Sequence, residues 1–393
     1  MKMIFKKIAI SSISMFLLAS CTSVNNNSID SDDSIDSVES NDSIESIEPK
    51  EYSITATNPI NNSQVSLASE DITEMYQNYS FACSQKYVCD EDHYASRGID
   101  LSWMAKDEAL YYLVEITTTN DFSDNVSSFV SNDASLHLDD LKPGYKYFWR
   151  VNAFYENKII RSQVFNFETL SISKSYYMET VKNFRDMGGY KTIDGKRVKS
   201  GLVFRGANAD GVSTDDKNFM LNTLNIKTEL DLRNANEGKR NVLGVENCVE
   251  VSDYGGLYYD SVPNGISKTD GHEVLAKEIK LFAKRDNYPI YYHCAIGRDR
   301  TGSLAMILYY LLGVDSKDIG VDYEISFFAV ASTRDVYDGI VSELLHQLFL
   351  IRNYIYARYT GNNMKEKTEA FLLDIGVTQE EINNIRDIML EDI

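Results

Sequence analysis

The chain has 393 residues, of which 43% are hydrophobic and 25% charged, and its formal net charge is −20 at pH 7. An acidic balance of this size argues against nucleic acid as a partner. The five histidines are scattered without a paired ligand motif, so we expect no metal and no cofactor.

The first twenty residues have the pattern of an export signal. Lys2, Lys6 and Lys7 precede the apolar run Ile8 to Leu18, and the tetrapeptide LASC ends at Cys21. This pattern resembles the bacterial lipoprotein signal, which implies that Cys21 is lipidated and anchors the exported protein to the extracytoplasmic face of the cell membrane. About eleven apolar residues are too few to span a bilayer, and no later segment is long and apolar enough. An ordinary secretory signal is the alternative.

The composition of residues 21–50 predicts a disordered acidic tether. From Ser28 to Glu51 the chain has nine acidic residues and a single lysine, interleaved with serines in near-repeats such as DSID and DSIE. A segment with so few apolar residues and so much like charge cannot bury a core, and self-repulsion extends it. We therefore expect a solvated stalk.

Residues 51–172 have the pattern of an all-β region. Tyr145 to Phe154 alternate apolar and polar positions, as in a half-buried strand, and Tyr112, Val114 and Ile116 repeat the pattern. With Leu101 to Trp103 and Phe165 to Leu170, the region resembles a fibronectin type III β-sandwich. The resemblance implies a module that binds, presents or acts as a spacer.

Two cysteines of this region lie close in sequence. Because an exported protein meets oxidising conditions, we expect a small disulfide between Cys83 and Cys89. Cys248 has no evident partner.

The C-terminal part, residues 178–393, predicts an α/β domain with a parallel-rich sheet and flanking helices. Helical patterns alternate with short apolar strands, and Gly376 divides the last helical stretch. The expected helices are Ser213–Leu224, Glu273–Lys284, Thr301–Leu312 and Glu366–Leu390, and the expected strands include Ile226–Leu232 and Pro289–Tyr292.

The ten residues His293 to Gly302, HCAIGRDRTG, form a strand-to-helix turn with a cysteine six positions before an arginine. Backbone N–H groups of such a turn lack internal partners and favour an anion. Beside these N–H groups and Arg300, we expect Cys294 to be a thiolate, the nucleophilic form of cysteine.

Each remaining loop residue suits phosphate chemistry. The planar fork of Arg300 can hold two phosphoryl oxygens, and Gly297 permits a backbone conformation that a side chain would forbid. The Thr301 hydroxyl is placed to hydrogen-bond the sulfur as it leaves. We expect Ala295, Ile296, Gly297, Arg298 and Thr301 to bind the phosphate during attack on a phosphate monoester.

The loop resembles that of the bacterial tyrosine and dual-specificity lipid phosphatases, which reads HCxxGKDRTG. Four further segments resemble the same family in the same order: Asn183–Tyr190, Gly201–Asn208, Leu230–Asn234 and Asp322–Ser326. The resemblance covers residues 178–393 and implies a cysteine-dependent phosphatase. Arg298 replaces the lysine of the family, which keeps the charge and leaves open how the loop divides its contacts between phosphotyrosine and inositol-lipid phosphates.

The leaving group needs a proton, and two carboxylic acids are candidates. The family is thought to use the loop aspartate, which is Asp299 here. The alternative acid is Asp231, at the end of an apolar strand, for which pairing with Arg233 is at least as good an explanation. We interpret His293 as a brace for the cysteine backbone.

The sequence therefore predicts a surface-anchored phosphatase, with protein phosphotyrosine as the first substrate hypothesis and phosphoinositides or inositol phosphates as the second. A hypothesis of another class is a surface adhesion protein in which the phosphatase domain is inactive. The physiological target, and whether the anchor faces the outside medium or a periplasm, are left open.

Overall fold

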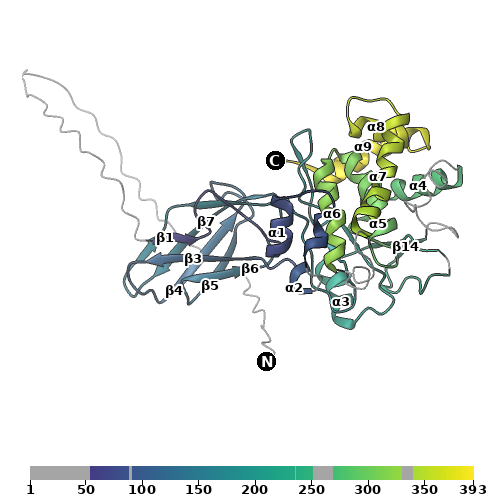
Figure 1. Ribbon diagram of the computed structural model, residues 1–393. Helices are drawn as coiled ribbons and strands as arrows, with labels where there is room; N and C mark the ends of the chain where they lie inside the picture. The colour runs from purple at the N-terminus through teal and green to yellow at the C-terminus, as the bar shows by residue number, and fades with distance from the viewer. Residues whose placement is uncertain (1–53, 88–90, 235, 251–268, 330–339) are drawn as a thin grey trace, which may run out of the picture. The chain divides into compact units, whose positions relative to one another are not determined.

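The computed structural model describes residues 54–87, 91–234, 236–250, 269–329 and 340–393 (Figure 1). The expected export signal, Cys21, the acidic tether and Cys89 lie outside the described residues, so these predictions stay predictions. Within the described ranges, no helix combines the length and the apolar character that a membrane crossing requires.

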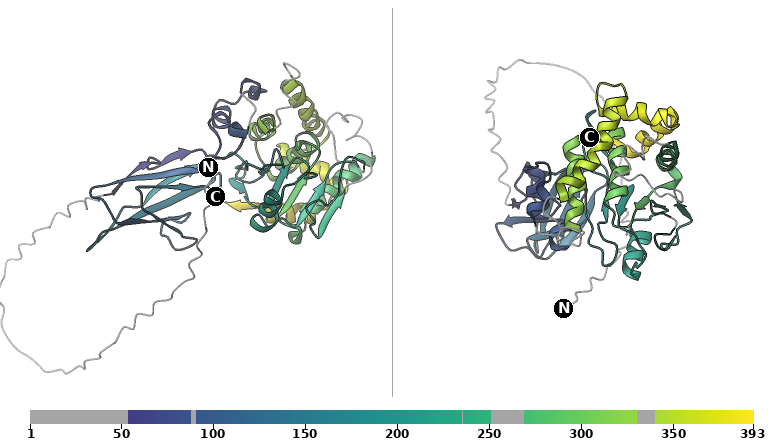
Figure 2. Two further views of the ribbon diagram at one scale, coloured as in Figure 1. Left: turned by 90° about the horizontal axis from the view of Figure 1, so that it is seen from below. Right: turned by 45° about the vertical axis from the view of Figure 1, so that its right-hand side comes forward.

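The N-terminal region consists mainly of two β-sheets. Its elements are β1 (Ile54–Asn58), β2 (Ser63–Val65), α1 (Glu70–Gln77), η1 (Cys83–Lys86), α2 (Glu91–Tyr94), β3 (Ile99–Ala105), β4 (Tyr111–Thr117), β5 (Ser127–Ser131), β6 (Ser135–Leu138), β7 (Lys146–Phe154), β8 (Ile159–Arg161) and β9 (Phe165–Thr169). One sheet has the order β1-β3-β6, and the other has the order β2-β9-β7-β4-β5 with β8 beside β7. Figure 2 shows these strands from two further directions.

The predicted alternation along β4 and β7 is confirmed. Val114 and Val151 are register partners in the antiparallel pair, and both are buried. Trp149 is also buried, and its ring centroid lies 6.4 Å from that of Trp103 in the other sheet. The two sheets therefore share one apolar core. The identity of this region as a fibronectin type III domain stays a prediction.

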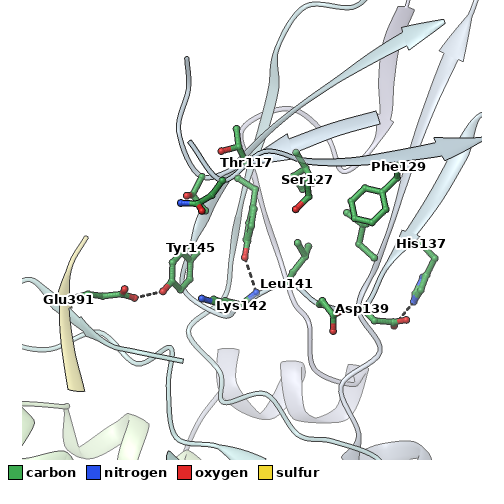
Figure 3. A pocket seen from close by; sticks show the side chains of 15 residues that line it. Thr117, Ser127, Phe129, His137, Asp139, Leu141, Lys142, Tyr145 and Glu391 are labelled. Carbon is green, nitrogen blue, oxygen red and sulfur yellow. Dashed lines mark hydrogen bonds and ion pairs between the residues drawn. The ribbon is translucent and has the colours of Figure 1, made fainter. Parts of the chain in front are cut away.

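A pocket of about 660 Å³, shown in Figure 3, is lined mainly by the N-terminal region and also by Glu391, close to the end of the chain. Its lining includes Phe129, His137, Asp139 and Leu141. None of its lining residues belongs to His293–Gly302. The pocket is therefore separate from the loop that carries the predicted chemistry.

The C-terminal region is a mixed α/β domain. Its elements are β10 (Arg185–Asp186), β11 (Lys196–Val198), β12 (Val203–Gly206), α3 (Thr214–Asn218), η2 (Phe219–Thr223), β13 (Thr228–Asp231), β14 (Asn247–Glu250), α4 (Thr269–Phe282), η4 (Arg285–Asn287), β15 (Ile290–His293), α5 (Asp299–Leu312), α6 (Ser316–Ala329), α7 (Ile340–Arg358), α8 (Met364–Asp374), α9 (Gln379–Met389) and β16 (Leu390–Asp392). The main sheet has the order β10-β12-β15-β13-β14. Its strands β12, β15, β13 and β14 are parallel, and β10 is antiparallel to β12.

The central strand β15 shows why the sheet is covered on both faces. Ile290 and Tyr292 belong to the large apolar cluster with α4, α5 and the helices that follow, whereas Tyr291 belongs to a second cluster with Met220 of η2. Successive side chains of a strand point to opposite faces, so a strand with no polar face has to be buried on both sides. The predicted parallel-rich α/β sheet is thereby confirmed.

The predicted helices are also found. Ser213 caps α3 by accepting a hydrogen bond from the Asp216 N–H at 3.2 Å, and Gly376, with φ +95°, lies between α8 and α9. All fourteen residues of α5 are buried. Because α5 is buried on every side and is mostly apolar after its first turn, it forms the centre of the domain.

The helical segment, residues 70–87 and 91–94, differs from the all-β expectation for residues 51–172. Ser69 caps α1, and Ile72 and Met75 form a buried helical face. This face joins an apolar cluster with Val321 and Phe328 of α6. The segment therefore packs against α6 of the α/β domain and not into the core between the two β-sheets.

Cys83 lies in this helical segment as a buried thiol, and its expected disulfide with Cys89, which lies outside the described residues, stays a prediction. The thiol belongs to the apolar cluster of α1 and α6. Burial is the largest cause that raises the pKa of the Cys83 thiol above its usual value. Packing into this core accounts for the burial of the thiol.

Candidate active site

The loop His293–Gly302 joins the end of the central strand β15 to the start of α5. Gly297 has φ +72°, and a Cβ there would lie 2.3 Å from the backbone oxygen of Gly206 at the end of β12. Only glycine satisfies both the left-handed backbone and this close approach. The loop is therefore pressed against the carboxyl end of β12.

Three successive carbonyl groups of the loop are bound from outside it. The Ala295 oxygen accepts from Asn208 Nδ2 at 2.7 Å, the Ile296 oxygen from Asn183 Nδ2 at 3.1 Å, and the Gly297 oxygen from Arg205 Nη2 at 3.0 Å. These donors belong to two of the segments noted in the sequence, Asn183–Tyr190 and Gly201–Asn208. The segments thus fix which way the peptide groups of the loop face.

A peptide group joins the oxygen of one residue to the N–H of the next, so binding of the Ala295 and Ile296 oxygens fixes the direction of the Ile296 and Gly297 N–H groups. In the part of the chain that the structure describes, the N–H groups of Ala295, Ile296 and Gly297 have no protein acceptor. Successive backbone N–H groups of this kind form an anion-binding concavity. The arrangement suits the oxygens of a phosphoryl group.

A buried cluster of one aspartate and two arginines is connected to the loop through the Gly297 carbonyl. Asp322 of α6 pairs with Arg185 at 3.1 Å and with Arg205 at 2.5 Å, and all three side chains are at most 2% exposed. Burial alone would raise the pKa of Asp322, but the two guanidinium groups outweigh it and hold the pKa below its usual value. Arg205 is therefore held between Asp322 and the Gly297 carbonyl.

Cys294 lies at the base of the loop and is 2% exposed. The preceding His293 donates from Nδ1 to the Cys294 carbonyl oxygen at 3.1 Å, and its Nε2 lies 3.0 Å from Glu229 Oε1. The imidazole thus holds the backbone at the cysteine, as the sequence analysis expected.

Arg300, in the first turn of α5, is engaged by a residue that the sequence analysis did not single out. Its Nη1 donates to Glu237 Oε2 at 2.5 Å and its Nη2 to Glu237 Oε1 at 3.3 Å. The Arg300 hydrogen bonds are the main cause that lowers the pKa of Glu237. A phosphate that binds Arg300 has to share or replace this carboxylate.

Asp299 is buried at the same helix start. Its Oδ1 accepts from Arg298 Nε at 2.7 Å and from the Tyr323 hydroxyl at 3.3 Å. The guanidinium of Arg298 also lies 5.1 Å from the ring centroid of Phe327. Arg298 is therefore turned toward Asp299 and α6.

The hydroxyl of Thr301 is buried and, within the described ranges, has no hydrogen-bond partner. A bond from Thr301 to the cysteine sulfur is accordingly not formed in this state.

Asp231 ends β13 and is bound by arginines. Its Oδ2 pairs with Arg233 at 2.9 Å and also contacts Arg240. Burial opposes ionisation, but hydrogen bonds from Arg233 and the charge of His293 lower the pKa of Asp231 below its usual value. A carboxylate bound in this way fits the structural role considered in the sequence analysis, which is pairing with Arg233.

Sequence reasoning missed Glu237, Asn183, Asn208 and Tyr323 as contacts of the loop. Asn183 and Asn208 lay in segments already noted, but nothing in their spacing indicated which loop oxygen they bind. Among the described residues, no cluster of three His, Cys, Asp or Glu side chains is placed to hold a metal ion.

Comparisons with known proteins bear on this region. Residues 176–391 match the model of a tyrosine phosphatase family. A provisionally named tyrosine-protein phosphatase of Cupriavidus necator is 25% identical over 174 residues, which cover 37% of this chain and 60% of that protein. The chain thus spans less than two thirds of the length of that relative.

Solved structures give a weaker likeness. The core catalytic domain of the PP-IP phosphatase SIW14 from S. cerevisiae is 17% identical, with a TM-score of 0.24, and the match covers 38% of this chain and 94% of that domain. A second structure of the Siw14 catalytic core is 16% identical, with the same TM-score of 0.24, over 39% of this chain and 92% of that core.

Proposed function

Because the chain belongs to the tyrosine phosphatase family, we propose that it hydrolyses phosphate monoesters, with protein phosphotyrosine as the substrate. The observation that carries the proposal is the set of carbonyls at Ala295, Ile296 and Gly297, each bound from outside the loop. The N–H groups of these three residues, which follow Cys294 in the chain, have no protein acceptor among the described residues and are left to receive an anion.

In the first step the Cys294 thiolate attacks phosphorus. An S–P bond forms while the P–O bond to the leaving group breaks, and protonated Asp299 gives its proton to the leaving oxygen. The loop N–H groups and the Arg300 guanidinium hold the other phosphoryl oxygens, where negative charge concentrates in the transition state.

In the second step water attacks the phosphorus of the cysteinyl phosphate. The S–P bond breaks, Cys294 leaves as a thiolate, and the Asp299 carboxylate takes the proton from the attacking water. The Thr301 hydroxyl, buried without a protein partner among the described residues, is available to donate to the departing sulfur. Inorganic phosphate is then released.

We assign the acid to Asp299 and not to Asp231. Asp231 is bound by Arg233 and Arg240, and its lowered pKa disfavours the protonated form that an acid needs. Asp299 is also bound by an arginine, Arg298 at 2.7 Å, and by the Tyr323 hydroxyl, so the assignment depends on its place in the loop itself, at the start of α5.

The test is turnover of a small aryl phosphate by the full-length protein. Cys294→Ser should lower kcat by roughly 10⁴-fold or more, and vanadate should inhibit the wild type. Asp299→Asn should slow esters of poor leaving groups by roughly 10²-fold and good ones much less. Wild-type protein without vanadate-sensitive turnover would favour the adhesion hypothesis, with the phosphatase domain inactive.

The position of Arg298 supports phosphotyrosine over phosphoinositides. A phosphoinositide headgroup carries further phosphates that call for additional cations. Arg298 is 6% exposed and directs its Nε to Asp299, so we do not expect it to take a second phosphate. Assaying a phosphotyrosine peptide beside a phosphoinositide tests this choice, and faster turnover of the lipid would reverse it.

We also propose that the enzyme is anchored outside the cytoplasm through Cys21, with the N-terminal region as a fibronectin type III-like domain. The lipoprotein pattern of residues 1–21 supports this location. Metabolic labelling with palmitate should mark the wild type and not Cys21→Ser. Equal labelling of the two proteins would exclude this anchor.

A further inference from the structure

The helical segment, residues 70–87 and 91–94, is joined to α6 by a buried carboxylate. Glu324 of α6 accepts from the Ala82 N–H at 2.9 Å through Oε1 and from the Ser84 N–H at 2.7 Å through Oε2. The Tyr79 hydroxyl is also hydrogen-bonded to this carboxylate. Glu324 is fully buried. One side chain of the α/β domain thus receives donors from three residues of the helical segment.

A glycine in α6 leaves room for the Tyr79 side chain at this contact. Gly320 lies one turn before Glu324, and a Cβ there would be 2.2 Å from the Tyr79 hydroxyl oxygen. Val321, Ile325 and Phe328 of α6 complete the contact by packing with the apolar residues of the segment. Figure 1 shows α1 and α2 beside α6. These residues recur every three to four positions, so they lie on one face of α6, and this face contacts the helical segment.

A buried carboxylate is a costly way to join two elements that already share an apolar contact. Burial is the main cause that raises the pKa of Glu324, and the donated hydrogen bonds oppose it. Apolar residues of similar size would join the elements at lower cost. We therefore expect the directional hydrogen bonds of Glu324 to hold α6 in one defined position, which an apolar contact alone would not do.

The residues beside Glu324 lead to the candidate active site. Tyr323 donates its hydroxyl to Asp299 Oδ1 at 3.3 Å, and a Cβ on Gly302 would lie 2.8 Å from the Tyr323 ring. Asp322 binds Arg205, which in turn donates to the Gly297 carbonyl. Three consecutive residues of α6 thus contact the loop support, the proposed acid and the helical segment.

We propose that Glu324 is a positioning residue, through which the helical segment fixes α6 and thereby the Tyr323 hydroxyl and Asp299 in the active-site loop. This inference depends on the proposed function of Asp299 as the acid. It makes part of the N-terminal region a component of the catalytic unit, and not only a spacer. Glu324 itself does not touch the reacting atoms.

Glu324→Gln tests the proposal in the full-length chain. The amide keeps the size of the side chain but presents its own N–H₂ to one of the two backbone donors, so the contact weakens. We expect turnover of a poor leaving group, such as a phosphotyrosine peptide, to fall roughly tenfold, while turnover of a good leaving group falls less than about threefold. An equal fall in the turnover of both substrates would overturn the proposal.

Tyr323→Phe removes the hydrogen bond to Asp299 directly and should give the same selective loss. If Glu324 acts through Tyr323, the double variant loses no more than the larger single loss. Additive losses would contradict the coupling. Ile325→Val is the matched control because it trims one methyl group from the same buried contact, and we expect both substrates to be turned over within about twofold of the wild type.

Hydrogen exchange followed by mass spectrometry gives a readout without turnover. Glu324→Gln should speed exchange of peptides covering residues 78–87 and also of those covering 294–301. Should the wild type show no turnover, the proposed function fails while this coupling is still measured. If the wild type is active and exchange at 294–301 is unchanged in the variant, the positioning role is wrong. Where Glu324→Gln does not fold, Tyr79→Phe weakens the same contact more mildly and should change both readouts in the same direction.

Discussion

Glu237 holds the guanidinium of Arg300 by two hydrogen bonds, one to each terminal nitrogen, at 2.5 and 3.3 Å. The fork that a phosphoryl group would use is therefore already bound to a carboxylate in this structure. Because Glu237 is 39% exposed, water and salt weaken the pair.

Replacing Glu237 with Gln should strengthen phosphate binding, since the phosphate no longer competes with a carboxylate. Exposed pairs of this kind contribute at most about 1 kcal/mol, so we expect inhibition by inorganic phosphate to become roughly two- to fivefold tighter. The inhibition constant measured at constant ionic strength checks this. Weaker inhibition in the variant would instead show that Glu237 orients Arg300 for binding.

The pH dependence of the same pair has a definite sign. Arg300 lowers the pKa of Glu237, so the ion pair is complete above the ordinary glutamate pKa and is lost as the pH falls through the lowered value. The advantage of Glu237→Gln in phosphate binding should therefore persist at neutral pH and shrink in acid. An advantage that grew as the pH fell would contradict this assignment.

Asp322→Asn should destabilise the fold, because it leaves the buried guanidinium groups of Arg185 and Arg205 without a counter-charge. Breaking a buried ionic group in this way costs about 3 to 5 kcal/mol of unfolding free energy, measured by urea denaturation. Ser326→Ala, which removes a single acceptor at 3.1 Å from Arg185 Nη2, is the control and should cost about 1 kcal/mol.

Acid should affect these two variants differently, because only the effect of Asp322→Asn depends on a charge. The lowered pKa of Asp322 means that its stabilisation is present above the unfolded aspartate pKa and disappears as the pH falls through the folded value. The difference in stability between the wild type and Asp322→Asn should therefore narrow in acid. A difference independent of pH down to the acid-unfolding range would show that Asp322 does not act as a charge.

Cys83 should resist alkylation in the folded protein. The thiol is 5% exposed, and burial raises its pKa, so both access and the thiolate fraction are low. Iodoacetamide labelling followed by peptide mass spectrometry should modify Cys83 only after denaturation. Labelling of Cys83 in the folded protein would contradict this, and a Cys83–Cys89 linked peptide from the non-reduced protein would instead confirm the disulfide expected from the sequence.

Local patterns in the sequence predicted a large part of the fold. The alternation from Tyr145 to Phe154, the cap at Ser213 and the break at Gly376 all correspond to observed elements. Each depends on residues within a few positions of one another, so a short window of sequence contains the information. The buried helix α5 was recognised for the same reason, since its apolar run is continuous.

Contacts between distant residues were not predictable in this way. Glu324 and Ala82 are 242 positions apart, and Arg300 and Glu237 are 63 apart. Neither pair has a local signature. The helical segment around Ile72 did have one, a cap and a helical apolar spacing, but the strand patterns on either side obscured it. Asn183, Arg205 and Asn208, which bind the loop carbonyls, are likewise far from the loop in the sequence.

The central claim is that the Cys294 sulfur forms a bond to phosphorus. Full-length protein mixed with a ³²P-labelled aryl phosphate and quenched in acid within the first turnover should yield a labelled peptide that contains Cys294. Cys294→Ser should yield none, and Asp299→Asn should still yield it when the leaving group is good. Turnover by the wild type with no label on Cys294 at any quench time would contradict the account.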